Sequence, residues 1–177
     1  MGENNNIKNI KLLLMDVDGV LTDGRIVLGE KEELKFFHIQ DGMGINMARR
    51  AGLKVGVITG RSSKCVDKRA KELKMDFVVQ GSETKLKALQ KILKSGGMNF
   101  ENVCYIGDDL NDIPVLERVG FSATVNNAPN IVKSKVNFIS KRKGGKGAVR
   151  EIIEYVLKAQ GKLDLVIEEM LDSWRVE

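Results

Sequence analysis

The sequence has 177 residues, of which 42% are hydrophobic and 30% are charged, and its formal net charge is +5. That length fits one compact domain with its own core, and no stretch approaches the roughly 20 apolar residues of a membrane span. The single histidine, His38, excludes His-based metal clusters and Ser-His triads, so acid–base chemistry must fall to carboxylates or lysines. The basic excess does not indicate nucleic acid, because lysines are scattered among acids without a basic stripe. An anionic small substrate accounts for it equally well.

The chain shows no internal repeat, low-complexity tract or Pro-rich linker, so residues 1–177 are predicted to form a single domain. The first nine residues are polar and Asn-rich and lack the pattern of a secretory signal, so we expect a soluble, cytoplasmic protein. The two cysteines, Cys65 and Cys104, have no paired metal-type spacing, and we expect both to be reduced core residues.

Short apolar runs alternate with helix-like segments along the chain. The first run, at residues 10–18, is continuously apolar up to its acidic end, which is typical of a strand buried on both faces. Further strands are predicted at 54–59, 77–80, 103–107, 121–125 and 136–139, and helices at 45–51, 63–73, 83–93, 113–119 and 148–159. This alternation predicts an α/β fold, a Rossmann-like parallel sheet with helices on both faces and right-handed crossovers.

Two segments depart from this alternation. Residues 25–39 hold two β-like halves around Gly29 and the charged residues 30–33, which predicts a β-hairpin inserted after the first strand, at about 24–40. Such a hairpin is too small to form a cap domain and is marginally stable alone, so we expect it to pack on another surface, such as that of a neighbouring subunit. The tail, at about 160–177, is amphipathic after a glycine break and is either a final helix or a segment that docks elsewhere.

Polar side chains follow the predicted strands, where ligands gather in parallel α/β sheets. Because alternate residues of a strand face the same way, Asp16 and Asp18 can point into one site while Val17 packs against the core. Residues from later strand ends and the next helices join them, namely Thr59, Arg61, Lys85, Asp108 and Asp112. Carboxylates, a hydroxyl and an ammonium are therefore expected to meet at one edge of the sheet.

This set of side chains suits phosphoryl transfer. Mg²⁺ prefers oxygen ligands, which Asp16, Asp108 and a backbone carbonyl near Asp18 can supply. Asp16 can act as the nucleophile and form an aspartyl-phosphate. Asp18 can protonate the departing hydroxyl and then deprotonate the attacking water. Thr59 and Lys85 can balance the charge on the phosphate oxygens.

Four motifs in chain order resemble those of the haloacid dehalogenase superfamily: DVDG from Asp16, Thr59, Lys85, and GDDLND from Gly107. Over about residues 10–164 the chain also resembles the 3-deoxy-D-manno-octulosonate (KDO) 8-phosphate phosphatase family. That likeness rests on DVDGVLTDG from Asp16, QDGMGI from Gln40, ITGRSS from Ile58, GDDLND from Gly107, KGGKGAVRE from Lys143 and AQGKLD from Ala159.

The resemblance implies a phosphoric monoester hydrolase of lipopolysaccharide biosynthesis that releases phosphate from KDO 8-phosphate. The implied catalytic residues are Asp16, Asp18, Thr59 and Lys85; the metal ligands are Asp16, Asp18 and Asp108, for Mg²⁺ with Mn²⁺ or Co²⁺ as alternatives; and the substrate contacts are Asp18, Asp41, Gly42, Arg61, Arg69, Lys85 and Asn111. It further implies a homotetramer built through the hairpin, without a large cap, in which the tail can close over a neighbour's site.

Other functions remain open at this stage. A phosphatase of a nine-carbon nonulosonic acid 9-phosphate needs the same core with other contacts, and a non-catalytic oligomerisation module of this fold is the alternative from another class. A slowly hydrolysing receiver module is disfavoured, because Asp18 supplies an acid/base two residues past the nucleophile. Asp109 fits catalysis and helix capping about equally, and His38 fits packing or an interface better than catalysis.

Overall fold

The computed structural model describes residues 5–29 and 33–175, and its centre is a six-stranded parallel sheet of order β5-β4-β1-β6-β7-β8. In chain order the strands are β1 (Leu12–Met15), β4 (Lys54–Ile58), β5 (Phe77–Val79), β6 (Val103–Ile106), β7 (Phe121–Thr124) and β8 (Phe138–Ile139). Strand β1 lies between β4 and β6, with Leu14 opposite Gly56 and Tyr105. The predicted parallel sheet is therefore confirmed, and its first strand, predicted to be buried on both faces, lies in the interior of the sheet.

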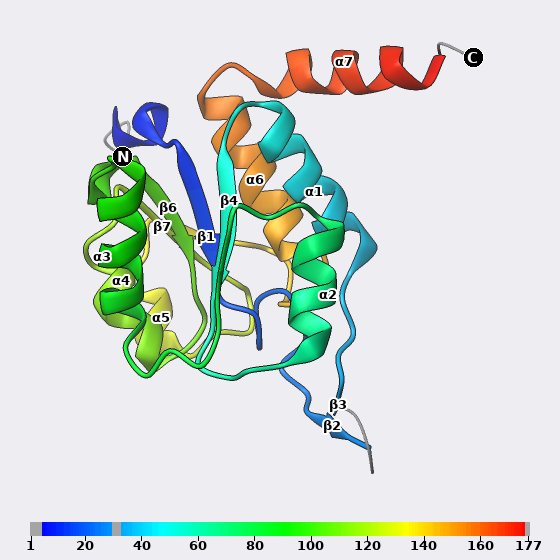
Figure 1. The fold of residues 1–177 in the computed structure, drawn as a ribbon. Coiled ribbons are helices and arrows are strands. Elements are labelled where there is room, and N and C mark those ends of the chain that lie inside the picture. Colours follow the sequence, from blue (N-terminus) through cyan, green and yellow to red (C-terminus); the bar gives the residue numbers. More distant parts are fainter. Residues whose placement is uncertain (1–4, 30–32, 176–177) are drawn as a thin grey trace.

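Helices cover both faces of the sheet (Figure 1). One face carries α3 (Lys85–Gly96), α4 (Ile113–Leu116) and α5 (Asn130–Lys133), and the other carries α1 (Ile39–Arg50), α2 (Lys64–Glu72) and α6 (Ala148–Ala159). Leu12 and Leu14 of β1 belong to the core cluster on the first side, and Leu13 and Met15 to the cluster on the second. Successive side chains of a strand point to opposite faces, so a strand covered on both sides must be apolar throughout.

Helix α1 begins earlier than predicted, at Ile39 instead of residue 45. Its first turns hold the buried glycines Gly42 and Gly44 in place of large apolar residues. A Cβ on Gly44 would lie 3.0 Å from the Cα of Arg150 in α6, so the glycine lets the two helix backbones approach closely. A helix face that packs through glycines has no apolar period, which is why the sequence pattern did not extend the predicted helix back from residue 45 to its observed start at Ile39.

The predicted hairpin is present but shorter than expected, with antiparallel strands β2 (Val27–Leu28) and β3 (Glu33–Leu34). Residues 30–32 of its predicted turn lie outside the described residues. The hairpin projects beyond the end of the sheet at which the carboxyl ends of the strands lie (Figure 1). This position places its base beside the site described below.

The tail forms a helix, α7 (Leu163–Arg175), which settles the alternative left open by the sequence. It lies at the opposite end of the molecule from the hairpin (Figure 1). Val166 and Met170 are buried, whereas Leu165 and Trp174 are 64% and 59% exposed. The short helix α5 and three 3-10 helices, η1 (Asn5–Asn9), η2 (Phe100–Asn102) and η3 (Leu110–Asp112), were not predicted. Across residues 5–29 and 33–175, none of the helices combines the length and hydropathy needed to cross a bilayer.

Candidate active site

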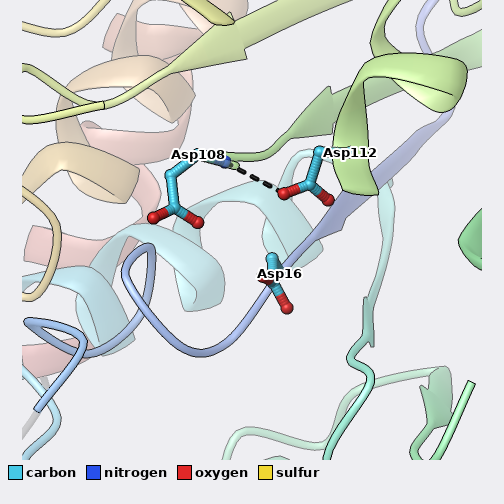
Figure 2. A group of neighbouring side chains, drawn as sticks. All are labelled: Asp16, Asp108 and Asp112. Atoms are coloured by element: carbon cyan, nitrogen blue, oxygen red, sulfur yellow. Dashed lines mark hydrogen bonds between the residues drawn. The ribbon is translucent and has the colours of Figure 1, made fainter. Parts of the chain in front are cut away.

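The carboxyl ends of β1 and β6 bring three aspartates together (Figure 2). Asp16 follows β1, Asp108 follows β6, and Asp112 ends the 3-10 turn η3, and one carboxylate oxygen from each lies within 4.8 Å of the other two. Gly19, with φ of +94°, makes room for this approach, because a Cβ there would lie 2.0 Å from Asp108 Oδ2. The motifs that begin at Asp16 and at Gly107 lie far apart in the chain and thus meet at a glycine.

Asp112 is fully buried, and both of its carboxylate oxygens accept hydrogen bonds. Its Oδ1 accepts from Lys85 Nζ at 2.7 Å and from the Tyr105 hydroxyl at 2.7 Å. Its Oδ2 accepts from the backbone N–H of Asp108 at 3.1 Å, the bond drawn in Figure 2, and from that of Asp109 at 3.2 Å. Asp112 therefore ties the loop after β6 to a lysine of α3 and to the middle of β6.

Lys85 lies between two carboxylates, 2.8 Å from Asp16 Oδ2 and 2.7 Å from Asp112 Oδ1, and its side chain is 2% exposed. Burial by itself lowers the pKa of Lys85, but Asp112 and Asp16 more than offset that effect, so the pKa is raised above its ordinary value. The ammonium is therefore a fixed positive charge beside the Asp16 carboxylate.

Burial raises the pKa values of Asp16 and Asp108, because it disfavours the charged carboxylate. Burial raises the pKa of Asp16 to about 6, against the opposing effect of Lys85. Burial, together with the charges of Asp16 and Asp112, raises the pKa of Asp108 to about 7. The negative charge gathered here is thus incompletely balanced by the protein itself.

These residues fit a divalent cation. The three carboxylates and Lys85 leave a formal charge of −2 when all are ionised. Asp108 Oδ1 is buried and has no hydrogen-bond partner among the described residues, an arrangement that proteins otherwise avoid. Hard cations such as Mg²⁺ take oxygen ligands of this kind. The acidic cluster can therefore hold a metal. The carboxylate oxygens of Asp16 and Asp108 accept fewer hydrogen bonds than those of Asp112 and are the more available ligands.

Asp18 lies apart from this cluster and turns its carboxylate toward the hairpin. Its Oδ1 accepts a hydrogen bond from Lys35 Nζ, and its Oδ2 is 3.8 Å from Arg61 Nε. Arg61 also pairs with Glu33 through Nη2 at 2.9 Å. Thr59, 2% exposed at the end of β4, accepts the backbone N–H of Arg61 at 3.4 Å. The structure thus brings Thr59, Arg61 and Asp18 together, as the sequence suggested, and adds Lys35.

Three other predicted substrate contacts, Asp41, Gly42 and Arg69, pack against neighbouring residues in this conformation. Asp41 is buried, and its carboxylate accepts the backbone N–H groups of Gly147 at 3.3 Å and Arg150 at 2.9 Å at the start of α6. Its pKa is raised by burial, against the lowering effect of these bonds. In this conformation Asp41 stabilises the N-terminus of α6, where negative charge is favoured.

Arg69 and Gly42 form a second packing contact on the same side. Arg69 pairs with Glu72 at 2.8 Å and lies over the Phe37 ring at 5.8 Å. A Cβ on Gly42 would lie 2.4 Å from Arg69 Nη2. Among the described residues, the contacts of Arg69 are with these groups and not with the acidic cluster.

Near the cluster, Asn111 is exposed on η3. Asp109 accepts the N–H of Leu110 at 2.7 Å and caps η3, so the capping alternative describes its contacts.

The sequence analysis did not identify several side chains that contact the predicted residues, among them Lys35 and Tyr105. Lys35 lies 17 residues after Asp18 in the chain, and no sequence pattern near Lys35 predicts their contact. Tyr105 carried a usable signal, because a polar hydroxyl in the middle of a fully buried strand needs a partner.

A parallel α/β sheet with paired carboxylates after its first strand, a buried lysine and an acidic loop after β6 defines a hydrolase of the haloacid dehalogenase type. Consistently, a family model described as haloacid dehalogenase-like hydrolase matches residues 77–153.

Relatives that match most of the chain identify the family within this class. The chain is 44% identical over 158 residues to the 3-deoxy-D-manno-octulosonate 8-phosphate phosphatase KdsC of Escherichia coli, covering 89% of this chain and 84% of that protein. It is similar to a crystal structure of 3-deoxy-D-manno-octulosonate 8-phosphate phosphatase from Moraxella catarrhalis in complex with magnesium, phosphate and KDO, with a TM-score of 0.91, 40% identity and coverage of 94% and 97% of the two chains. The cobalt-bound phosphatase from Haemophilus influenzae gives a TM-score of 0.87 at 39% identity, with coverage of 90% and 94%. The chain belongs to the KDO 8-phosphate phosphatase family, which confirms the resemblance drawn from its motifs.

Proposed function

We propose that this protein hydrolyses 3-deoxy-D-manno-octulosonate 8-phosphate to KDO and phosphate through an aspartyl-phosphate at Asp16, as a step in lipopolysaccharide biosynthesis. The observation that carries the proposal is the buried Asp16 carboxylate, fixed by Lys85 at 2.8 Å beside Asp108. The phosphatase names of its relatives and the sugar acid and phosphate bound in the Moraxella structure supply the substrate.

Asp16, Asp108 and the backbone carbonyl of Asp18 are proposed to hold Mg²⁺, with Mn²⁺ or Co²⁺ as alternatives. When bound, the cation supplies positive charge that offsets the repulsion between the phosphate and the carboxylates. Magnesium and cobalt are present in the two related structures. Asp108 Oδ1, which has no hydrogen-bond partner within residues 5–29 and 33–175, supports this assignment.

The reaction then proceeds in two displacements. An Asp16 carboxylate oxygen attacks phosphorus, the phosphorus–oxygen bond to the sugar breaks, and the departing sugar oxygen takes a proton from Asp18. In the second step, Asp18 accepts a proton from water as the water oxygen attacks phosphorus and Asp16 leaves as a free carboxylate. Lys85 and Thr59 stabilise the charge on the phosphate oxygens throughout.

The sugar acid is proposed to meet Arg61, whose guanidinium fork suits a carboxylate. In the present conformation Arg61 binds Glu33, so a substrate carboxylate would exchange with that side chain. Asp18, Lys85 and Asn111 are also proposed to contact the substrate. Asp41, Gly42 and Arg69 are retained as proposed contacts that require some rearrangement of their present packing, or a neighbouring subunit.

A homotetramer formed through the hairpin is part of the proposal. The hairpin exposes Leu28 at 77% and Leu34 at 52%, and Phe36 just after it at 62%, which is an unusual density of apolar surface. Helix α7 lies at the far end of its own chain (Figure 1), so only the tail of another subunit could approach this site. The chain is also proposed to form a single domain. We propose that it acts in the cytoplasm, because a charged sugar phosphate made there does not cross a membrane unaided.

Phosphate release from a panel of sugar-acid phosphates with Mg²⁺ tests the function. We expect KDO 8-phosphate to be hydrolysed with a higher kcat/KM than a nine-carbon nonulosonic acid 9-phosphate. Asp16→Asn should lose at least about 10³-fold in kcat, while Glu101→Gln, an exposed acid on η2, should retain wild-type turnover. Preference for the nine-carbon substrate would support the alternative phosphatase, and no release from any phosphate ester would support a non-catalytic module.

A further inference from the structure

Four charged side chains form a network at the base of the hairpin, defined here as the Asp18 network: Asp18, Glu33, Lys35 and Arg61. Lys35 Nζ contacts Asp18 Oδ1 and is 3.4 Å from Glu33 Oε1. Arg61 Nη2 binds the same Glu33 oxygen at 2.9 Å. Two acids and two bases thus join the loop after β1 to the hairpin and to the loop after β4.

Lys35 is the most buried member of this network. Its side chain is 1% exposed, whereas those of Asp18, Glu33 and Arg61 are 21%, 17% and 47% exposed. A lysine ammonium that is removed from water must stay paired, because an unpaired buried charge is costly. Its acceptors among the described residues are Asp18 and Glu33, and the contact with Asp18 is the shorter.

The two oxygens of Asp18 are held differently. Oδ1 is engaged by Lys35, while the 3.8 Å separation between Oδ2 and Arg61 Nε is too long for a hydrogen bond. One oxygen therefore anchors the carboxylate and the other is left for proton transfer. Without the anchor, a partly exposed aspartate on a loop would sample several rotamers.

We propose that Lys35 is a positioning residue for the acid/base Asp18, so that the hairpin takes part in the chemistry of its own subunit. This inference rests on the proposed function, because it assigns Asp18 to proton transfer. Lys35 itself touches no reacting atom. It holds the carboxylate at the angle from which Oδ2 can reach the leaving oxygen, and such orientation is a substantial part of general acid–base catalysis.

The consequence depends on the leaving group. A sugar alkoxide is a poor leaving group and needs a proton as it departs, whereas p-nitrophenolate departs without one. The parameter kcat/KM covers steps up to departure of the first product, so it isolates the step in which Asp18 acts as an acid. Loss of Lys35 should therefore reduce kcat/KM for alkyl phosphates selectively.

The experiment compares Lys35→Met, Lys35→Gln, Lys35→Arg and the control Lys94→Met, an exposed lysine on α3. For KDO 8-phosphate, Lys35→Met should lower kcat/KM by about 10- to 100-fold, below the full range of about 10² to 10⁴ for general acid–base catalysis. For p-nitrophenyl phosphate the change should stay within about threefold. Lys35→Gln and Lys35→Arg keep an N–H donor and should recover part of the loss.

A double mutant isolates the coupling. Added to Asp18→Asn, Lys35→Met should cause no further loss with the sugar phosphate, because its effect runs through Asp18. Equal losses with the alkyl and aryl substrates, or multiplicative losses in the double mutant, would overturn the inference. If Lys35→Met does not fold, the same contrast measured in Lys35→Gln decides. If wild-type protein prefers another alkyl phosphate, the proposed substrate fails, and the alkyl-to-aryl comparison with that ester still tests Lys35.

Discussion

Replacing Tyr105 with Phe isolates one hydrogen bond in the middle of the site. The hydroxyl is fully buried and donates to Asp112 Oδ1 at 2.7 Å. Hydrogen bonds to charged groups contribute about 1.5–3 kcal/mol, and for a chain of this length each kcal/mol shifts the melting temperature by about 2–4 °C. Tyr105→Phe should therefore lower the melting temperature by roughly 3–12 °C.

The same change should reach the chemistry through Lys85, because Lys85 Nζ and the tyrosine hydroxyl share one carboxylate oxygen. Loss of such an outer hydrogen bond typically costs activity by about 10-fold or more, so we expect kcat/KM for KDO 8-phosphate to fall by about that factor. Tyr155→Phe is the matched control, since Tyr155 is 45% exposed and its ring packs against that of Phe138 with the centroids 4.4 Å apart. Scanning fluorimetry and phosphate release give both quantities. If Tyr105→Phe is indistinguishable from Tyr155→Phe in both, the network reasoning is wrong.

Two further predictions concern the buried charges. The folded-state pKa of Asp108, about 7, lies above its ordinary value of 3.8, so the folded protein holds this proton more tightly than the unfolded chain does, and stability falls as pH rises between those values. In EDTA, Asp108→Asn should therefore melt above wild type at pH 8, with a gap that closes toward pH 4; a gap independent of pH would contradict this. Lys85→Met leaves Asp16 and Asp112 without their shared cation and should lower the free energy of unfolding by about 3–5 kcal/mol in urea titrations at pH 8, and a loss below about 1 kcal/mol would show that the ion pairs contribute little.

Much of the fold follows from the sequence because the strands of a parallel sheet are apolar on both faces. The run at β1 was recognisable for that reason, and its neighbours β4 and β6 followed from the same pattern. The start of helix α1 was predicted too late in the chain because its buried face there consists of Gly42 and Gly44. These residues have no side chain and so give no apolar pattern, although they let neighbouring groups approach closely. The hairpin strands are only two residues long, so period-two alternation could not set their limits.

The candidate site was predictable to the extent that it depends on strand ends. Asp16, Lys85 and Asp108 each follow or begin an element, and the parallel arrangement alone brings such positions to one edge. The contact of Lys35 with Asp18 depends instead on how the hairpin folds back on its base. The contact between the Asp41 carboxylate and the backbone of α6 likewise depends on tertiary packing, and the resemblance that assigns Asp41 to the substrate gives no sign of it.

Asp16, Asp108 and Asp112 carry the same side chain, and the hydrogen bonds that each carboxylate accepts distinguish the ligands from the orienting residue. Both oxygens of Asp112 already accept two bonds each, which uses the lone pairs available to a carboxylate. Asp16 accepts one bond at each oxygen, from Val17 N–H and from Lys85. Asp108 Oδ1 accepts none among the described residues. A cation entering this cluster would gain most from Asp108 and Asp16 and would have to break existing bonds to use Asp112. Asp112 is therefore better suited to orienting Lys85 and the loop after β6 than to binding metal.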